Sequence, residues 1–245
     1  MLQQRLMKMT ISSNSRRRAA LSQVINVIVT GLAFMKVQNK SGNLIDKNNI
    51  VMSRKSIAVI YGSDSSEWEV ACRSGEFTAS RIDGSRYEVY EIFARFGQWS
   101  LVAYRKLNSI RVLIPEGERP QIDKTDFSVM LGGEKVKFDY AYIMQHGTPG
   151  ENGKMQGYLE MLGVPHSGCN AFVAAMTFDK YSCKSYLKDV DFVKCADDIF
   201  IRKGDSLEGL AQAAVNRLGL PLFVKPTDGG SSFGVSKVKS LEDFD

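Results

Sequence analysis

The sequence contains few residues of the kinds that build metal centres and disulfide frameworks. Its 245 residues include four cysteines and two histidines. The cysteines are scattered without a Cys-x-x-Cys pair, and only the two histidines could join them as metal ligands. We therefore expect neither a zinc site nor a disulfide framework. The residues concerned are Cys72, Cys169, Cys183, Cys195, His146 and His166.

Long hydrophobic runs are also absent. The longest apolar stretch, Ala20–Met35, is interrupted by four polar residues and is too short to cross a bilayer, so no transmembrane anchor is predicted. We interpret residues 1–54 as an over-long start or a dispensable leader, because Met52 offers a second start directly before a strong strand. A targeting peptide is the alternative, since "RRR" before an apolar run has that outline, but the run is followed by "KVQNK" rather than by a small-residue cleavage site.

Acidic residues are scarce only at the beginning of the chain. The whole sequence carries a net charge of +5. Eight basic side chains and one acidic side chain precede Met52, a net charge of +7, so the remainder carries −2 of the total +5. The body of the protein is nearly neutral, which argues against a basic nucleic-acid-binding face.

Short apolar runs alternate with a helical pattern in the first half of the body. "SIAVIYG", residues 56–62, is typical of a buried parallel strand that runs into a loop. Residues 67–82 are expected to form a helix, and "YEVYEIFAR" from Tyr87 the next strand. This order implies a right-handed crossover between parallel strands. "FDYAYIMQHG", residues 138–147, is expected as a further buried strand. Extended pairs or insertions are expected at residues 99–104, 110–114 and 127–131.

The second half is expected to begin with helices and to end with a hairpin. Helices are predicted at residues 153–163 and 170–189, the latter with a break near Phe178. A third, residues 206–219, has Ser206 as its cap and Gly219 as its stop. "LPLFVKP" then predicts a strand, followed by the loop "TDGGSSFG" and the return strand "VSKV". Because no helix follows the glycines, this is a hairpin flap and not a strand-to-helix phosphate loop.

Four features could carry chemistry, and each also has a structural interpretation. The loop Gly229–Gly234 offers backbone N–H groups and hydroxyls that suit polyphosphate, or it is a flexible turn. Lys225 beside it either meets an anion or extends to solvent. The loop His146–Gly153 ends a strand and begins a helix, which favours a carboxylate, or it is a capping turn. Glu67 could pair with an ammonium group, or it is an acid of a helix's first turn.

Three segments, taken together and in this order, resemble the D-alanine:D-alanine ligase family of the ATP-grasp superfamily. The most specific is "HGTPGENGKMQGYLEMLGVPHSG", from His146 to Gly168. "FDKYSCK" from Phe178 and "LPLFVKPTDGGSSFGVSKV" from Leu220 follow it. The resemblance runs from Ser56 to Asp245. Departures occur at Tyr61, Ala71, "GEN" and "FDK", where the family commonly has glycine, serine, Gly-Glu-Asp and Met-Asp-Lys.

The resemblance implies a role for each residue that matches a family motif. Glu67 would hold the ammonium group of the first D-alanine, and His146 would lie near that substrate's carboxylate. Ser231 would orient substrate from the flap, so Glu67 and Ser231 are the expected catalytic residues. The ATP phosphates would be bound by lysines and flap residues, namely Lys180, Lys225, Gly230, Ser231 and Ser232.

The resemblance also implies a fold and an activity. The fold class is α/β, with an N-terminal Rossmann-like parallel-sheet domain at residues 55–170 and the start of an α+β ATP-grasp domain at residues 171–245. The activity is ATP-dependent ligation of two D-alanines through an acylphosphate, for peptidoglycan precursors, with ATP and Mg²⁺ as cofactors. A cytoplasmic protein is implied, without nucleic-acid or membrane partners, and a homodimer is its expected assembly. A related ligase with another acceptor such as D-lactate, and an inactive remnant, are the alternatives.

In the resembled family, the Mg²⁺ ligands and an arginine that stabilises the reaction intermediate lie downstream of the flap. The sequence ends at Asp245, so no metal ligand is named. We expect the isolated 245-residue chain to be poorly stable and inactive, because the flap strands would expose apolar surface. The measurement is D-alanine-dependent release of ADP by the purified chain. Release at an ordinary ligase rate would contradict this expectation.

Overall fold

The computed structural model describes residues 55–206, 209–230 and 232–244. Residues 1–54, for which a leader is predicted, lie outside this part, as does Ser231. Contacts group residues 52–245 into one unit. Among the described residues, no helix is long and apolar enough to cross a membrane.

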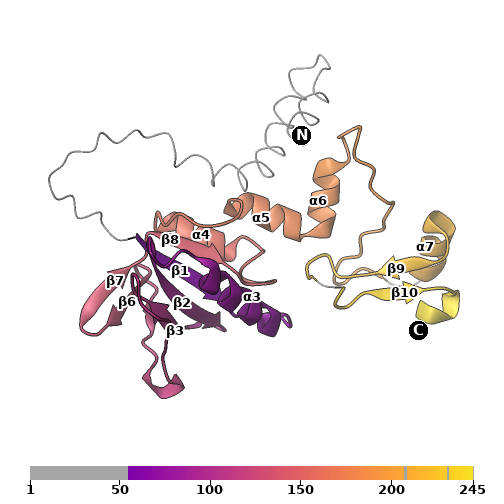
Figure 1. The fold of residues 1–245 in the computed structure, drawn as a ribbon. Helices are drawn as coiled ribbons and strands as arrows, with labels where there is room; N and C mark the ends of the chain where they lie inside the picture. Colours follow the sequence, from indigo (N-terminus) through magenta and orange to yellow (C-terminus); the bar gives the residue numbers. More distant parts are fainter. Residues whose placement is uncertain (1–54, 207–208, 231, 245) are drawn as a thin grey trace, which may run out of the picture. The chain divides into compact units, whose positions relative to one another are not determined.

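A five-stranded sheet with a parallel centre organises the first half of the chain (Figure 1). Strand β1 (Lys55–Tyr61) lies between β2 (Tyr87–Arg95) and β8 (Tyr140–Ile143) and is parallel to both. Strands β3 (Gln98–Arg105) and β4 (Val112–Leu113) extend the sheet beyond β2 with antiparallel pairing. The predicted parallel sheet of a mixed α/β fold is confirmed. The strand expected at residues 138–147 is shorter, because the chain leaves the sheet after Ile143 and forms a loop.

Helices cover the two faces of this sheet, and successive residues of β1 are buried on opposite faces. Ala58 and Ile60 of β1 belong to one core, which also contains Met155 and Leu159 of helix α4 (Lys154–Met161). The intervening Val59 belongs to a second core, which contains Ala79 of helix α3 (Trp68–Arg81). Strand β1 is therefore buried on both sides, which explains why its sequence is apolar without alternation.

A small sheet is inserted between β4 and β8. It consists of β5 (Ile122–Asp123), β6 (Ser128–Leu131) and β7 (Glu134–Lys137), and a short 3₁₀ helix, η2 (Glu116–Glu118), precedes it. Aromatic rings join the insertion to the main sheet. Phe127 lies 4.9 Å from Phe138 and 6.4 Å from Trp99 between ring centroids. The extended pairs expected in this region are thus confirmed.

The second half of the chain contains two consecutive helices and a helix-covered hairpin. Helices α5 (Ala171–Phe178) and α6 (Lys180–Leu187) are separated at Asp179, one residue from the predicted break. The Asp179 carboxylate accepts a hydrogen bond from the Ser182 N–H at 2.6 Å and so caps α6. The hydroxyl and backbone N–H of Ser182 hold the pKa of Asp179 below its usual value.

The hairpin and its helix share a small core. Strands β9 (Leu222–Val224) and β10 (Ser236–Val238) pair antiparallel, as predicted for the flap. Their buried Leu222 and Val238 pack with Ala214 of helix α7. Helix α7 spans Leu210–Leu218, and a 3₁₀ helix, η3, spans Leu241–Phe244.

The predicted boundaries of α7 are correct at one end only. Gly219 ends the helix, as expected, with a φ of 75° and its N–H bonded to the Val215 carbonyl. Ser206 was wrongly predicted as the N-cap. Gly209, with a φ of 68°, occupies the cap position instead. The left-handed backbone of this glycine turns the chain into the helix three residues after Ser206, which places the serine too far upstream to cap it.

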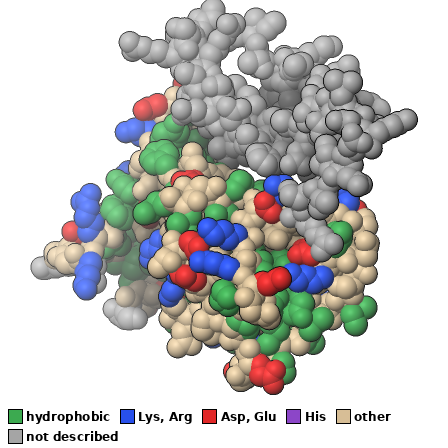
Figure 2. Space-filling model, turned by 90° about the vertical axis from the view of Figure 1, so that its left-hand side faces the viewer, with side chains coloured by type: hydrophobic (Ala, Val, Ile, Leu, Met, Phe, Trp, Pro, Cys, Tyr) green, Lys and Arg blue, Asp and Glu red, His purple; other side chains and the backbone are tan. Residues whose placement is uncertain are grey.

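Charges of both signs are mixed on one face of the molecule. On the face drawn in Figure 2, Lys and Arg side chains lie among Asp and Glu side chains and do not form a separate patch. This mixing agrees with the nearly neutral charge of the chain after Met52.

Tyr61 lies between β2 and α3 and contacts both. The resembled family commonly has glycine at this position. The Tyr61 hydroxyl donates to Glu91 Oε2 at 3.1 Å, and Glu91 is only 2% exposed. Arg111 donates to both oxygens of that carboxylate, at 2.5 and 2.7 Å. Burial, followed by the neighbouring Glu91 charge, raises the pKa of Tyr61. The Tyr61 ring lies against Gly75 of α3, where an added Cβ atom would be 2.2 Å from ring atom Cδ1.

We expect the substitution Gly75→Ala to destabilise the chain. Overpacking costs typically about 1–3 kcal/mol, whereas alanine gains about 1 kcal/mol over glycine in a helix. The difference is a net loss of about 0–2 kcal/mol, and we expect the upper half of this range because the methyl group would enter the Tyr61 ring. Urea denaturation measures it. Ser80→Ala, at an exposed position of the same helix, is the control, and an unfolding midpoint for Gly75→Ala at or above that control would contradict the packing argument.

Candidate functional site

Two loops meet at the carboxyl edge of the parallel strands. One follows β1 and the other follows β8, so the parallel pairing brings their beginnings together. The Asp64 N–H donates to the Thr148 carbonyl at 2.9 Å, and the Ser65 hydroxyl donates to the His146 carbonyl at 2.7 Å. The segments Ser63–Glu67 and His146–Glu151 therefore lie side by side, at the edge where open α/β sheets bind ligands.

The loop after β8 is closed by hydrogen bonds of its own. The Glu151 carboxylate accepts from the Gly147 N–H at 2.7 Å. The Gln156 side chain donates to the Gly150 carbonyl at 2.5 Å. A Cβ atom on Gly147 would be 2.7 Å from the Ser65 Cβ atom, so a glycine is needed where the two loops touch. One of the amides expected to meet a substrate carboxylate is thus already bonded to a carboxylate of the protein.

Glu67 and His146 are both half-buried at this edge. Glu67 precedes the first residue of α3, and its N–H donates to the Ser65 hydroxyl at 3.1 Å. The His146 Nε2 atom lies 3.3 Å from the Ser74 hydroxyl, which fixes the imidazole against α3. A carboxylate and an imidazole are thereby presented by neighbouring loops, and together they suit a ligand that carries both an ammonium group and a carboxylate.

Lys180 contacts the glycine-rich loop after β9. Its backbone N–H donates to the Thr227 carbonyl at 2.8 Å. Its ammonium group donates to the carbonyls of Thr227, at 3.3 Å, and Gly229, at 2.8 Å. The first turn of α6 therefore holds this loop, although 47 residues separate Lys180 from Thr227.

Gly230 reaches from the same loop to Glu67. A Cβ atom built on Gly230 would lie 2.7 Å from Glu67 Oε2. Lys225 and Ser232, by contrast, are exposed. Lys225 makes no hydrogen bond or ion pair with the part of the chain that the structure describes, and Ser232 has a φ of 60° in the turn before β10. The structure thus brings Glu67 and Lys180 to the loop that contains Gly230. It does not bring Lys225 into contact with these residues.

A cavity of about 530 Å³ lies beside these residues. It is lined by three of the predicted site residues, His146, Lys180 and Gly230, and also by Gln145 and Gln156. Both glutamines are at most 5% exposed, and their Oε1 atoms are buried without a hydrogen-bond partner among the described residues. Buried acceptors without partners are uncommon. Sequence reasoning did not single out either glutamine, although both belong to quoted motifs.

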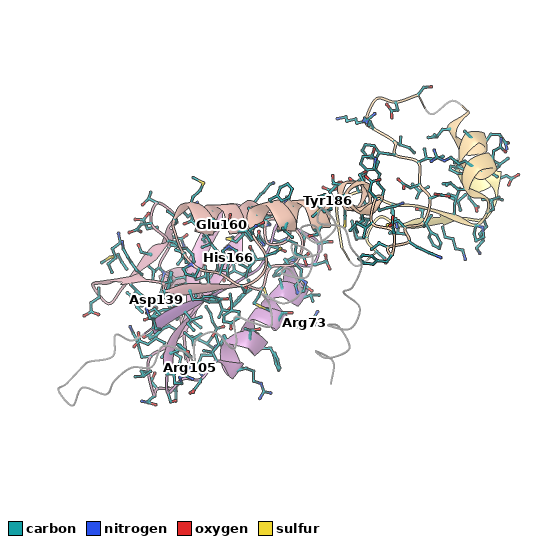
Figure 3. The ribbon with its side chains drawn as sticks, turned by 90° about the horizontal axis from the view of Figure 1, so that it is seen from above. Arg73, Arg105, Asp139, Glu160, His166 and Tyr186 are labelled. Atoms are coloured by element: carbon teal, nitrogen blue, oxygen red, sulfur yellow. The ribbon has the colours of Figure 1, made fainter. Side chains whose placement is uncertain are left out.

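His166, the second histidine, has a structural role. Figure 3 shows it beside Glu160 of α4. The His166 Nε2 atom lies 3.5 Å from Glu160 Oε1, and the Nδ1 atom lies 3.0 Å from the Ser167 carbonyl. The same Glu160 oxygen accepts from the Ala171 N–H at 3.0 Å, at the start of α5. These contacts tie α4 to α5.

No metal centre is found in the part of the chain that the structure describes. Within it, no three or more His, Cys, Asp or Glu side chains gather as ligands for a metal ion. The four cysteines have free thiols.

Two protein-family models match this chain. Residues 56–169 match "D-ala D-ala ligase N-terminus" and residues 187–245 match "D-ala D-ala ligase C-terminus". A curated "D-alanine--D-alanine ligase" of Phocaeicola vulgatus is 45% identical over 191 residues, which are 78% of this chain and 55% of that protein. The chain thus spans about half the length of the curated relatives that it matches.

Solved structures show the same fold. The D-alanine-D-alanine ligase of Coxiella burnetii is 26% identical with a TM-score of 0.62, covering 78% of this chain and 58% of that one. The VanG D-Ala:D-Ser ligase of Enterococcus faecalis is 23% identical with a TM-score of 0.63, covering 78% and 57%. Because this second enzyme has a different acceptor in its name, the fold alone does not determine the acceptor.

We expect Glu151→Ala to expose the Gly147 amide. A hydrogen bond to a charged acceptor contributes about 1.5–3 kcal/mol, so the amide hydrogen of Gly147 should exchange about tenfold faster or more. Hydrogen exchange followed by NMR measures this. The Met144 amide, which donates to the Ile60 carbonyl between strands, is the internal control. Unchanged exchange at Gly147 would mean that the carboxylate does not close the loop in solution.

Proposed function

The chain belongs to the D-alanine–D-alanine ligase family, and from this we propose that it contains the amino-acid site and the first part of the ATP site of an enzyme that joins two D-alanines. The dipeptide would serve peptidoglycan synthesis. The observation that carries the proposal is the meeting of the loops after β1 and β8, which places Glu67 and His146 at one edge beside the glycine-rich loop.

The proposed reaction has two steps. A carboxylate oxygen of the first D-alanine attacks the γ-phosphorus of ATP, an acylphosphate forms, and ADP leaves. The amine nitrogen of the second D-alanine then attacks the acyl carbon, phosphate leaves, and the nitrogen loses a proton. Catalysis of this kind depends mainly on positioning and on neutralising the charge of the phosphates.

Glu67 and His146 are proposed to bind the first D-alanine. The amino acid carries one positive and one negative group, and these two side chains offer a partner for each. The Ser74 hydroxyl near His146 Nε2 keeps the imidazole in place, and the Ser65 hydroxyl orients the start of α3 and thereby Glu67. Ser231, which lies outside the described residues, is proposed to orient the substrate from the flap.

Lys180 and the glycine-rich loop are proposed to bind the ATP phosphates. Lys180 and Gly230 line the same cavity. Lys225 and Ser232 are exposed, so they are accessible to a nucleotide. Mg²⁺ enters the proposal only as the companion of ATP, because the described residues offer no ligand cluster for it.

The finer features of the family are part of the same proposal. They are a Rossmann-like N-terminal domain at residues 55–170, the start of an ATP-grasp domain at residues 171–245, a cytoplasmic location and a homodimeric assembly. Nucleic acid and membrane are not among the proposed partners. The acceptor is proposed to be D-alanine, and product analysis with D-lactate offered against D-alanine distinguishes the related ligases.

We expect Glu67→Gln to weaken binding of D-alanine to the 245-residue chain. Loss of a hydrogen bond between charged groups costs about 1.5–3 kcal/mol, which corresponds to an affinity about 10- to 150-fold lower. NMR titration of the isotope-labelled chain with D-alanine measures the change. Glu69→Gln, an exposed acid two residues further on, is the matched control, and L-alanine is the control ligand. Equal affinities for the two variants, or for the two enantiomers, would contradict the proposed amino-acid site.

A further inference from the structure

The first turn of helix α3 follows Glu67 directly. Glu67 occupies the N-cap position, with a φ of −92° and a ψ of 11°, and its side chain makes no capping hydrogen bond. The first N–H groups of a helix have no partner within the helix, so an end without a side-chain cap is weakly held. The turn that presents Glu67 therefore depends on contacts with other elements.

Trp68, the first residue of α3, makes such a contact. Its ring lies edge-on to the ring of Phe93 in β2, with the ring centroids 6.4 Å apart and the planes at 83°. The guanidinium carbon of Arg95, the last residue of β2, lies 4.4 Å from the Trp68 ring centroid. Phe93 and Arg95 are two residues apart and so lie on the same face of the strand. The start of α3 is thereby attached to the carboxyl end of β2.

The Arg95 guanidinium interacts with rings and not with an acid. Its Nε atom is buried, and Arg95 makes no hydrogen bond or ion pair with the part of the chain that the structure describes. Besides Trp68, its guanidinium carbon lies 4.8 Å from the centroid of the Phe96 ring. A cation is attracted to the face of an aromatic ring, and the attraction is stronger where water is excluded. Arg95 is therefore suited to holding the Trp68 ring.

The loop between β1 and α3 is attached to the same end of β2. The Phe96 N–H donates to Asp64 Oδ1 at 2.5 Å. A Cβ atom on Gly62 would lie 2.9 Å from the Ala94 carbonyl oxygen, so the two backbones approach closely where the loop begins. These contacts fix the beginning of the loop, and the contact of Trp68 with β2 fixes its end.

We propose that Trp68 is a positioning residue for Glu67, with Arg95 as the group that holds its ring. The inference rests on the proposed function, because it takes the ammonium group of D-alanine as the ligand of Glu67. Trp68 acts through the first turn of α3, which it keeps in the arrangement that presents the carboxylate. When only a fraction of the molecules has the competent arrangement, the apparent affinity falls by that fraction.

Two measurements on the 245-residue chain test this role. NMR titration gives the dissociation constant for D-alanine. Hydrogen exchange of the Ala71 amide reports the first turn of α3, because this amide donates to the Glu67 carbonyl at 3.0 Å. We expect Trp68→Leu to lower the affinity for D-alanine about tenfold and to speed Ala71 exchange by a similar factor. A loss of affinity below about threefold would overturn the inference.

Two further variants assign the effect to the contact between the ring and the guanidinium. Trp68→Phe should restore binding to within about threefold of the unsubstituted chain, because a phenyl ring keeps an aromatic face for Arg95. Arg95→Met should reproduce the effect of Trp68→Leu. The double variant should bind no more weakly than either single variant, because both changes remove the same contact. Arg95→Met also keeps the test decisive if Trp68→Leu fails to fold.

Phe77→Leu is the matched control. Phe77 is an aromatic residue of the same helix, and the guanidinium carbon of Arg81 lies 5.0 Å from its ring centroid. The Phe77 side chain is 62% exposed and lies away from the first turn. This variant should keep both the affinity for D-alanine and the exchange rate of the Ala71 amide.

A purely structural role for Trp68 would give a different pattern. The Ala71 amide and the Met144 amide between β1 and β8 would then exchange faster by the same factor in Trp68→Leu, and folded molecules would bind D-alanine as before. That pattern, or weak binding by Trp68→Phe, would overturn the inference and leave the proposed function in place. Failure of the unsubstituted chain to bind D-alanine, or unchanged binding by Glu67→Gln, would overturn the proposed function and the inference with it.

Discussion

The parallel pairing of β1 with β2 on one side and β8 on the other is the constraint on which the other features depend. Parallel neighbours end at the same edge of a sheet, so the loops that follow β1 and β8 must meet. Their contact then determines several details at once. Gly147 must lack a side chain beside Ser65, and α3 must lie where the Ser74 hydroxyl reaches His146.

The centre of this sheet contains a buried charge, which is unusual for a parallel strand environment. Glu91 is almost fully buried, and its carboxylate is satisfied by Tyr61 and by both nitrogen donors of Arg111. A buried carboxylate that lost one partner would be costly, so the three side chains act as a unit. Tyr61 stands immediately before the site loop after β1, and its ring also determines how closely α3 can approach. The network therefore fixes the base of the loop that carries Glu67.

Patterns in the sequence predicted the elements of the fold, because strand β1 and helices α3 and α4 have apolar residues at the spacings that burial requires. They did not predict contacts between distant segments. Glu151 looked like part of an anion-binding motif, yet its own carboxylate bonds the Gly147 amide, which depends on how the loop closes. The hydrogen bonds from Lys180 to Thr227 and Gly229 likewise depend on tertiary packing. So do the side-chain oxygens of Gln145 and Gln156, which have no hydrogen-bond partner among the described residues. The Ser206 cap failed because a glycine three residues later offered the chain a better turn.

The small core under the hairpin has a consequence for the native-state energetics of the protein. The buried side chains there are Ala214, Leu222 and Val238, whereas those of the five-stranded sheet form two larger clusters. Regions with few buried apolar contacts open at lower free energy than the rest of a protein. Transient opening will therefore start at the hairpin, and a molecule that binds only the closed form would suppress it by mass action. The element proposed to bind nucleotide is thus also the one whose persistence would respond most to nucleotide concentration.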